Sequence, residues 1–394
     1  MVEWQSVRLG TVVSTNQSTY SIKENWQFVN YLDTGNITMN RIDKIQYINT
    51  LMDKLPSRAR RKVKLNSIIY STVRPNQLHY GMIKEQPENF LVSTGFVVID
   101  VNSEKAVPDY LYYVLTQKEI TEQLQAIAEQ SVSAYPSLKP SDIENLEVLL
   151  PDIDTQKGIV AVLHAIDEKI KQNIEINNNL EQQAQAIFAN EFLSLDTLPE
   201  GWKQASLIDI ADYLNGLAMQ KYRPTADESG IPVLKIKELR QGCCDNNSEL
   251  CSPSIKSDYI IHDGDVIFSW SGSLLVDFWC GGICGLNQHL FKVTSNKYDK
   301  WFYYAWTKHH LDRFIAVAAD KATTMGHIKR DELSKAEVLV PNKADYKRIG
   351  ALLQPIYDLI IANRIENKKL AETRDTLLPK LMSGEIDVSE VDYE

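Results

Sequence analysis

The sequence contains a long internal repeat. Residues 138–180 align without a gap onto residues 328–370, at an offset of 190. Identical pairs include Lys139/Lys329, Glu147/Glu337, Val148/Val338, Leu149/Leu339, Pro151/Pro341, Lys157/Lys347, Ile159/Ile349, Ala161/Ala351, Leu163/Leu353, Ile166/Ile356, Ile170/Ile360, Asn173/Asn363, Asn177/Asn367 and Leu180/Leu370. Because a fixed period indicates repeated structural units, we expect two copies of one helical element.

The segments that precede each copy repeat more loosely. Trp4/Trp202, Leu9/Leu207 and Ser71/Ser269 match at an offset of 198, and the Tyr-Tyr pairs at 112–113 and 303–304 match at 191. The offset changes through the loops, so two related globular domains are expected with different surfaces. The predicted borders are 1–137 for the first globular domain, 138–196 for the first helical region, 197–327 for the second globular domain, and 328–394 for the second helical region with its tail.

The globular domains are predicted to be α+β, with mixed helix and sheet. Short runs of β-branched and aromatic residues, bounded by Gly, Asn or Pro, predict strands at Ser67–Val73, Gly95–Val101, Asp265–Trp270 and His289–Thr294. Apolar residues spaced nearer 3.6 than 2 predict helices at Pro108–Glu129 and Trp301–Ala318.

Each helical region shows the alternating three- and four-residue spacing of a coiled-coil seam. The first seam is Leu163, Ile166, Ile170, Asn173, Asn177, Leu180, Ala184 and Ile187, and the second is Leu353, Ile356, Ile360, Asn363, Asn367, Leu370 and Leu377. Arg374 takes the place of Ala184, so it should extend towards solvent or lie near the end of the seam. Helices at about 154–189 and 345–378 would each be about 50 Å long at 1.5 Å per residue.

The paired asparagines favour a specified helix pairing. Polar residues at seam positions lower stability, but they fix register and partner geometry. The alternative is a solvated stripe on an ordinary amphipathic helix. Their coincidence in both copies favours the first interpretation.

Composition indicates a folded protein of more than one domain that works in a reducing compartment. The chain is 44% hydrophobic and has five cysteines, an odd number that forms no disulfide framework. Residues 1–10 lack an apolar signal core, and no stretch reaches the roughly 20 apolar residues of a membrane span. We therefore expect a cytoplasmic protein that is not associated with a membrane. Cys243, Cys244, Cys251, Cys280 and Cys284 with His289 could bind zinc, but they lack two CxxC pairs, and buried thiols are the simpler interpretation.

The formal charge of −10 argues at first against DNA, because Lys and Arg supply most sequence-independent affinity for phosphate. Its distribution weakens that argument. The net charge is +1 for residues 1–137, −7 for 138–198, −2 for 199–327 and −2 for 328–394. Most of the acidity lies in one segment, which can stand away from DNA.

Known catalytic motifs are missing from the sequence. It contains no Gly-rich cofactor loop after a strand, no Asn/Asp-Pro-Pro-aromatic segment of a methyltransferase and no GxxxxGK[ST] of a motor. It also contains no HExxH and no GxSxG. "GGICG" at 281–285 does not have the context of a phosphate loop. The chain is therefore predicted to bind without catalysing, and no cofactor is expected on it.

Two variable domains alternating with two similar helical regions resemble the specificity subunits of type I restriction-modification systems over essentially the whole chain. Local phrases are similar too: "TTMGHIKRDELSKAEVLVP" (323–341) and "EVLLPDIDTQKGIVAVLHAIDEKI" (147–170) for the helical regions, and "NSIIYSTVRP" (66–75), "IPVLKIKEL" (231–239) and "DGDVIFSWSGS" (263–273) for the target-recognition domains. The two predicted domains differ from each other near the end of the equivalent strand. The first has Thr-Val-Arg-Pro at 72–75, and the second has Trp-Ser-Gly-Ser at 270–273.

The resemblance implies a fold and partners. Each target-recognition domain would hold one half of an asymmetric bipartite site in double-stranded DNA. The two helices would pack as an antiparallel coiled coil with a pseudo-twofold repeat, and their length would set the unread spacer. Two methyltransferase subunits carrying S-adenosylmethionine would bind this chain, and restriction and motor subunits would join them.

Candidate DNA-binding residues come from charge runs and from positions after strands. Arg58, Arg60, Arg61, Lys62 and Lys64 could clamp phosphate, or could be a solvated charge run. Arg74 and Asn76 could reach base edges, since Arg pairs with guanine and Asn with adenine. The remaining candidates are Ser71 in the first domain, Lys235, Lys237, Arg240, Ser269, Trp270, Ser271 and Ser273 in the second, and Thr323, Thr324, His327 and Lys329 at its junction with the helix. Trp270 could equally be core, and helix capping equally explains the threonines.

Two alternatives remain at this point. A two-headed adaptor that binds proteins is favoured by the net charge, and strongly salt-dependent binding to duplex DNA would separate it from a DNA reader. An enzyme with an unrecognised nuclease or methyltransferase site is the other, and methyl transfer by the purified chain alone would favour it.

Overall fold

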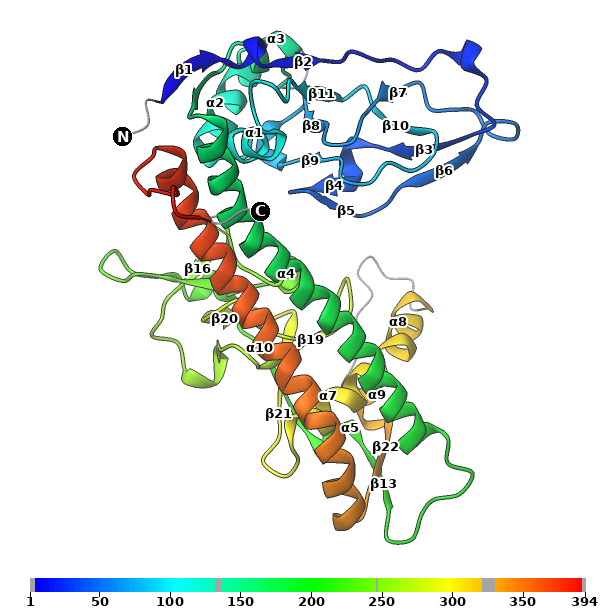
Figure 1. The fold of residues 1–394 in the computed structure, drawn as a ribbon. Helices are drawn as coiled ribbons and strands as arrows, with labels where there is room; N and C mark the ends of the chain where they lie inside the picture. Colours follow the sequence, from blue (N-terminus) through cyan, green and yellow to red (C-terminus); the bar gives the residue numbers. More distant parts are fainter. Residues whose placement is uncertain (1–3, 132–135, 246, 321–329, 392–394) are drawn as a thin grey trace. The chain divides into compact units, whose positions relative to one another are not determined.

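The computed structural model describes residues 4–131, 136–245, 247–320 and 330–391 (Figure 1). The chain folds into two compact units. Unit 1 is Met1–Asp167 with Glu372–Glu394, and unit 2 is Glu168–Ala371.

Unit 1 is built on two four-stranded sheets. One has the order β2-β11-β8-β9 and is antiparallel throughout. The other has the order β6-β3-β10-β7, in which β3 and β10 run parallel. Their bounds are β2 Val13–Thr15, β11 Phe96–Val101, β8 Ile68–Ser71, β9 Tyr80–Met82, β6 Gln46–Asn49, β3 Phe28–Leu32, β10 Phe90–Ser93 and β7 Ala59–Lys62.

Unit 2 repeats this topology strand for strand. Its sheets have the orders β14-β21-β18-β19 and β16-β15-β20-β17, and the central pair β15 and β20 is again parallel. Their bounds are β14 Asp212–Asn215, β21 Leu290–Thr294, β18 Val266–Ser269, β19 Leu275–Phe278, β16 Leu250–Cys251, β15 Ile231–Leu234, β20 Cys284–Leu286 and β17 Ile260–Ile261. The loose sequence repeat therefore corresponds to one shared framework, and the four predicted strands are β8, β11, β18 and β21.

Between the central strands the two units differ. Unit 1 has the hairpin β4 (Ile37–Thr38) and β5 (Arg41–Ile42) between β3 and β6, whereas unit 2 has the helix α6 (Ile236–Gln241) between β15 and β16.

The two helices predicted at Pro108–Glu129 and Trp301–Ala318 are each divided into two helices in the structure. They are α1 Pro108–Leu115 with α2 Lys118–Glu129, and α7 Lys300–His309 with α8 Leu311–Asp320. Gln117 caps α2 in an extended conformation, which interrupts the helix. The apolar spacing continues across each break because both helices of a pair bury residues in the core of their own unit.

The predicted borders after residues 137 and 327 divide strands that pair. β1 (Gln5–Arg8) pairs antiparallel with β12 (Glu147–Leu150), and β13 (Lys203–Ser206) pairs in the same register with β22 (Glu337–Val340). The short helices α3 (Pro140–Glu144) and α9 (Arg330–Ser334) lead into β12 and β22. The start of each repeated segment thus completes a globular domain, and the helical part begins only after it.

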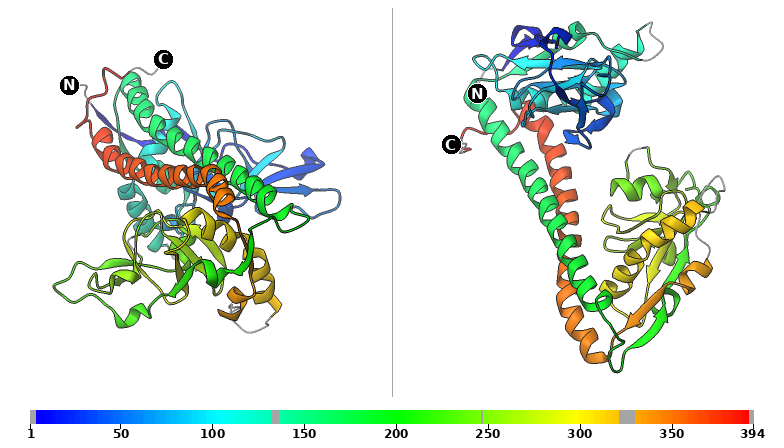
Figure 2. Two further views of the ribbon diagram at one scale, coloured as in Figure 1. Left: turned by 90° about the horizontal axis from the view of Figure 1, so that it is seen from below. Right: turned by 90° about the vertical axis from the view of Figure 1, so that its right-hand side faces the viewer.

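Two long helices follow these strands, as the seam predicted. α4 spans Ile153–Phe188 and continues as a π turn over Ala189–Leu193, and α10 spans Lys343–Met382. At 1.5 Å per residue, they are about 54 and 60 Å long. Figure 2 shows them side by side in both views. Pairing of Asn173 with Asn367 and of Asn177 with Asn363 shows that they run antiparallel.

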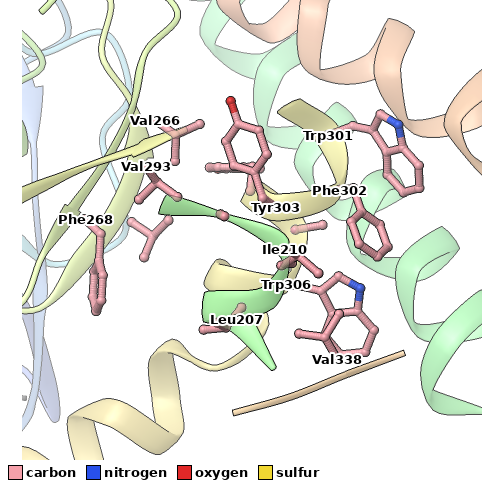
Figure 3. Packing of buried hydrophobic residues seen from close by; sticks show 14 of the residues in the cluster. Leu207, Ile210, Val266, Phe268, Val293, Trp301, Phe302, Tyr303, Trp306 and Val338 are labelled. Atoms are coloured by element: carbon pink, nitrogen blue, oxygen red, sulfur yellow. The ribbon is translucent and has the colours of Figure 1, made fainter. Parts of the chain in front are cut away.

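The core of unit 2 joins its sheet to its helices (Figure 3). α5 (Leu207–Ile210), β18 and α7 supply Leu207, Phe268 and Trp306. Leu353 and Ile360 of α10 belong to the same buried cluster. Within unit 2, the globular part and its helix segments therefore pack as one body.

Candidate nucleic-acid interface

In unit 1, the predicted loop after β8 and the predicted basic segment meet at one end of the sheets. The turn between β10 and β11 connects them. Thr94 N donates to Arg58 O (2.8 Å), and Thr72 donates to Gly95 O from both N (2.8 Å) and Oγ1 (2.9 Å). This end also receives the carboxyl ends of the parallel strands β3 and β10, the usual place for a binding site in such sheets.

The loop after β8 is held in one conformation. Val73 N donates to Ser71 Oγ (3.2 Å), and Leu138 N donates to Thr72 O (2.7 Å). Arg74 takes a left-handed conformation with φ of 50°, and Asn76 N donates to the side chain of Gln125 (3.2 Å). Arg74 and Asn76 are exposed, whereas Ser71 is 2% exposed and its hydroxyl also donates to Val73 O. Ser71 therefore shapes the loop, and Arg74 and Asn76 are its surface.

The basic run 58–64 does not form a single clamp. Arg58 is exposed at the sheet end, whereas Arg60, Arg61 and Lys62 lie on β7 and are half-buried. Lys62 pairs with Glu24, and Lys64 lies 3.7 Å from Asp100. The Nε of Arg61 is buried and has no hydrogen-bond partner among the described residues. Phosphate contact by this run stays a prediction.

Unit 2 builds the equivalent loop after β18 from different residues. The hydroxyl of Ser269, which is fully buried, donates to Ser273 O (2.9 Å) and Ser271 O (3.3 Å). The hydroxyl of Ser271 lies 3.1 Å from His289 Nδ1. Gly272, with φ of 66°, stands at the position of Arg74, 198 residues later. The backbone frame is thus shared, and the side chains on it differ.

Trp270 is half-buried on this loop. Its Nε1 donates to Asn215 Oδ1 (3.0 Å), and its ring centroid lies 5.6 Å from that of Phe291. One side of the indole therefore packs on the sheet, and contact of its other side with DNA stays a prediction.

The helix α6 brings the predicted basic residues beside this loop. Ile236 approaches Gly272, where an added Cβ would lie 3.6 Å from its Cδ1. Lys235 pairs with Glu249 (2.5 Å), and Lys237 pairs with Asp245 (3.1 Å), which raises the pKa of Lys237. Arg240 is exposed. Phosphate contact by Lys235, Lys237 and Arg240 stays a prediction.

Thr323, Thr324, His327 and Lys329 lie outside the described residues. Asp33 and Asn287, which directly follow the parallel strands β3 and β20, also lie at these strand ends, and the sequence alone did not indicate them. A polar residue directly after a strand is their only signal, and it becomes informative only when strand order is known.

The remaining candidates in unit 2 have structural explanations. An added Cβ at Gly281 would lie 2.3 Å from Trp279, whose Nε1 donates to Gly282 O (2.6 Å), so "GGICG" is a packed turn. Burial raises the pKa of Cys251 and Cys280 to about 11. In the described part of the chain, His, Cys, Asp and Glu side chains form no group of three suited to a metal, and no helix there could span a membrane.

Comparison with known proteins agrees with this architecture. The sequence profile of the type I restriction modification DNA specificity domain matches twice, at residues 1–182 and 199–372. The HindI specificity subunit of Haemophilus influenzae is 22% identical over 98% of this chain and 100% of its own length. The MjaIX specificity subunit of Methanocaldococcus jannaschii is 26% identical over 74% of this chain and 72% of its own.

Among solved structures, the type I restriction-modification S subunit from M. genitalium has a similar fold. Its TM-score is 0.56 at 14% identity, with 96% of both chains covered. Two profile matches that together cover most of the sequence establish the relationship: this chain belongs to the family of type I restriction-modification DNA specificity subunits.

Proposed function

We propose that each unit reads one half of a split sequence in double-stranded DNA, and that the chain performs no chemistry itself. The observation that carries this proposal is the pair of equivalent loops after β8 and β18. Both have a left-handed residue at the same place, but Arg74 stands in one and Gly272 in the other. One frame with different exposed side chains suits two readers of different half-sites.

The proposal assigns a different task to the helices. α4 and α10 would hold the half-sites at a fixed spacing, and two methyltransferase subunits with bound S-adenosylmethionine would bind along them, followed by restriction and motor subunits. The net charge of −7 over residues 138–198 supports a surface that faces protein and not DNA.

Selection from random duplexes tests the proposal. The chain would be purified with its methyltransferase partner, and bound duplexes would be sequenced at several salt concentrations. We expect one split motif whose affinity falls steeply with salt. Exchange of residues 4–152 for those of another family member should change one half of the motif only. Salt-insensitive binding without a motif would favour the protein-binding adaptor that the net charge of −10 suggests.

Methyl transfer tests the absence of catalysis. The chain alone, given DNA and labelled S-adenosylmethionine, should transfer no label. Label on the DNA would refute that part of the proposal.

A further inference from the structure

The β4–β5 hairpin is present in unit 1 and has no counterpart in the described part of unit 2. Its strands pair Ile37 with Ile42 and Thr38 with Arg41. The two residues between them, Met39 and Asn40, have φ of 47° and 64°. Positive φ at both central residues defines a type I′ turn, which usually takes Asn and Gly.

Hydrogen bonds hold the hairpin against residues 78–82, which directly follow the loop that contains Arg74. Met39 N donates to Leu78 O (2.9 Å), and Asn40 N donates to Tyr80 O (2.9 Å). His79 Nδ1 lies 2.6 Å from Ile37 O, and Met82 N donates to Asn40 Oδ1 (2.8 Å). Figure 1 shows β4 and β5 beside β9. The hairpin is therefore a rigid extension of the same sheet end that presents Arg74.

The tip of this hairpin exposes a charged and an apolar side chain, both of which could contact a ligand. The Arg41 side chain is 81% exposed, and its Nε lies 3.5 Å from Asp43 Oδ1. Met39 is 51% exposed although it is a large apolar residue. A guanidinium and an apolar side chain thus stand together on a rigid turn.

Backbone strain gathers at the same place. Met39, Arg74 and Leu78 have positive φ, at a cost of about 1–2 kcal/mol for each, and in the described residues every other non-glycine residue with positive φ is an asparagine, for which the cost is smaller. In the described part of unit 2, every residue with positive φ is a glycine. Strain of this kind concentrates at binding sites, where surrounding contacts hold it.

We infer that the β4–β5 hairpin is a base-reading element of unit 1. A two-stranded ribbon fits the major groove of duplex DNA. Arg41 would donate to the O6 and N7 atoms of a guanine, and Met39 would contact a thymine methyl group. This inference rests on the proposed function and adds a specificity determinant that unit 2 lacks.

The test measures discrimination at single base pairs. Once the split motif of the natural chain is known, each base pair of the half-site read by unit 1 is varied in turn, and binding by the complex with its methyltransferase partner is measured. Arg41→Ala and Arg41→Lys should each lower discrimination at one base pair by about 10- to 100-fold. The half-site read by unit 2 should be unchanged in both.

Further variants separate reading from folding. Met39→Gly relieves the strained φ, so it should keep or raise the Tm. It should also lower the preference for thymine over the other bases at one position of the half-site. Lys54→Ala removes an exposed cation from the connection that follows β6, at the opposite end of β3, and should change no preference.

The outcomes are distinct. If Arg41→Ala weakens binding to every duplex equally and keeps full discrimination at each base pair, Arg41 contacts phosphate only and the inference is overturned. If both Arg41 variants and Met39→Gly leave every preference unchanged, the hairpin does not read bases, while the proposed function stands. If the natural chain selects no split motif, the proposed function itself fails.

Discussion

Arg364 on α10 joins three segments of unit 2 through one side chain. Its guanidinium donates to Asp277 Oδ1 (2.7 Å) and Phe278 O (3.3 Å) on β19, and to Glu181 Oε1 (2.9 Å) on α4. The three side chains are each between 26% and 29% exposed. Because half-buried carboxylates are poorly hydrated, they depend on this partner.

Replacement of Arg364 should therefore destabilise unit 2. We expect Arg364→Met to lower the free energy of unfolding by roughly 3 kcal/mol, since it leaves Asp277 without its ion pair. Urea unfolding followed by tryptophan fluorescence measures this, because five of the seven tryptophans lie in unit 2. Lys308→Met removes a 3.4 Å pair with Glu181 and a 3.0 Å hydrogen bond to the hydroxyl of Tyr304, and should cost about 1 kcal/mol. Equal losses in the two variants would contradict the bridging role of Arg364.

His310 gives unit 2 a pH dependence. Burial lowers the pKa of His310 to about 4, from an ordinary 6.5, and its Nε2 lies 2.8 Å from Glu337 O. The unfolded chain binds the proton more strongly, so this contribution to stability is complete above about pH 6.5 and is lost as the pH falls towards 4. This pKa shift corresponds to a contribution of about 3 kcal/mol to the free energy of unfolding.

His310→Gln should remove this step. Urea midpoints of the natural chain and the variant, measured from pH 7 to pH 4, should converge as the pH falls. A constant difference over that range would show that His310 does not control the acid sensitivity.

At the scale of the element, the seam asparagines form two hydrogen-bonded pairs that the pseudo-twofold repeat interchanges. Asn173 Nδ2 donates to Asn367 Oδ1, and Asn363 Nδ2 donates to Asn177 Oδ1, both at 2.8 Å. Asn177 and Asn367 then donate to Ile360 O and Ile170 O, both at 3.3 Å. Such pairing tolerates no shift along the helices, because every polar group would lose its partner.

A double-mutant cycle tests this pairing. Asn177→Leu alone should cost about 1–3 kcal/mol, because it leaves the buried amide of Asn363 without its partner. Adding Asn363→Leu should recover part of that loss, with a coupling energy of about 0.5–3 kcal/mol. Asn178→Leu, on the exposed side of α4, should be nearly neutral. Additive losses in the double variant would contradict a specific pair.

The elements differ in how far the sequence predicts them. The long helices were predictable, because the seam is a local pattern, and their antiparallel pairing was expected only from the resemblance to a known family. The pairing of β1 with β12 and the parallel pairing of β3 with β10 join residues far apart in the chain, and no local pattern indicates such partners. The β4–β5 hairpin was not predicted from the sequence, because its turn, Met39-Asn40, lacks the usual Asn-Gly signal. Among the candidate site residues, the exposure of Arg74 was predictable from its place after a strand, and its contact with DNA stays a prediction. The burial of Ser71 and Ser269 depends on packing.

At the scale of the whole molecule, the repeat explains why one chain can read two sequences. A duplicated framework carries two surfaces with different residues, and two antiparallel helices belong to the same repeat. The spacing between half-sites would then depend on helix length alone.

Removal of one heptad from each helix should shorten that spacing. Deletion of residues 168–174 and of their antiparallel partners 366–372 keeps the seam in register and shortens each helix by about 10 Å, which is about three base pairs of DNA. Duplex selection should return both half-sites unchanged with a shorter spacer. An altered half-site would show that the helices do more than set distance.

The most direct test is to co-express this chain with its methyltransferase partner and to map methylated bases across the host genome by modification-sensitive long-read sequencing. We predict a single split motif with a fixed spacer that disappears when this chain is omitted. Methylation of the same motif without this chain, or a stable complex that methylates no defined motif, would contradict its role as the reader of the DNA sequence.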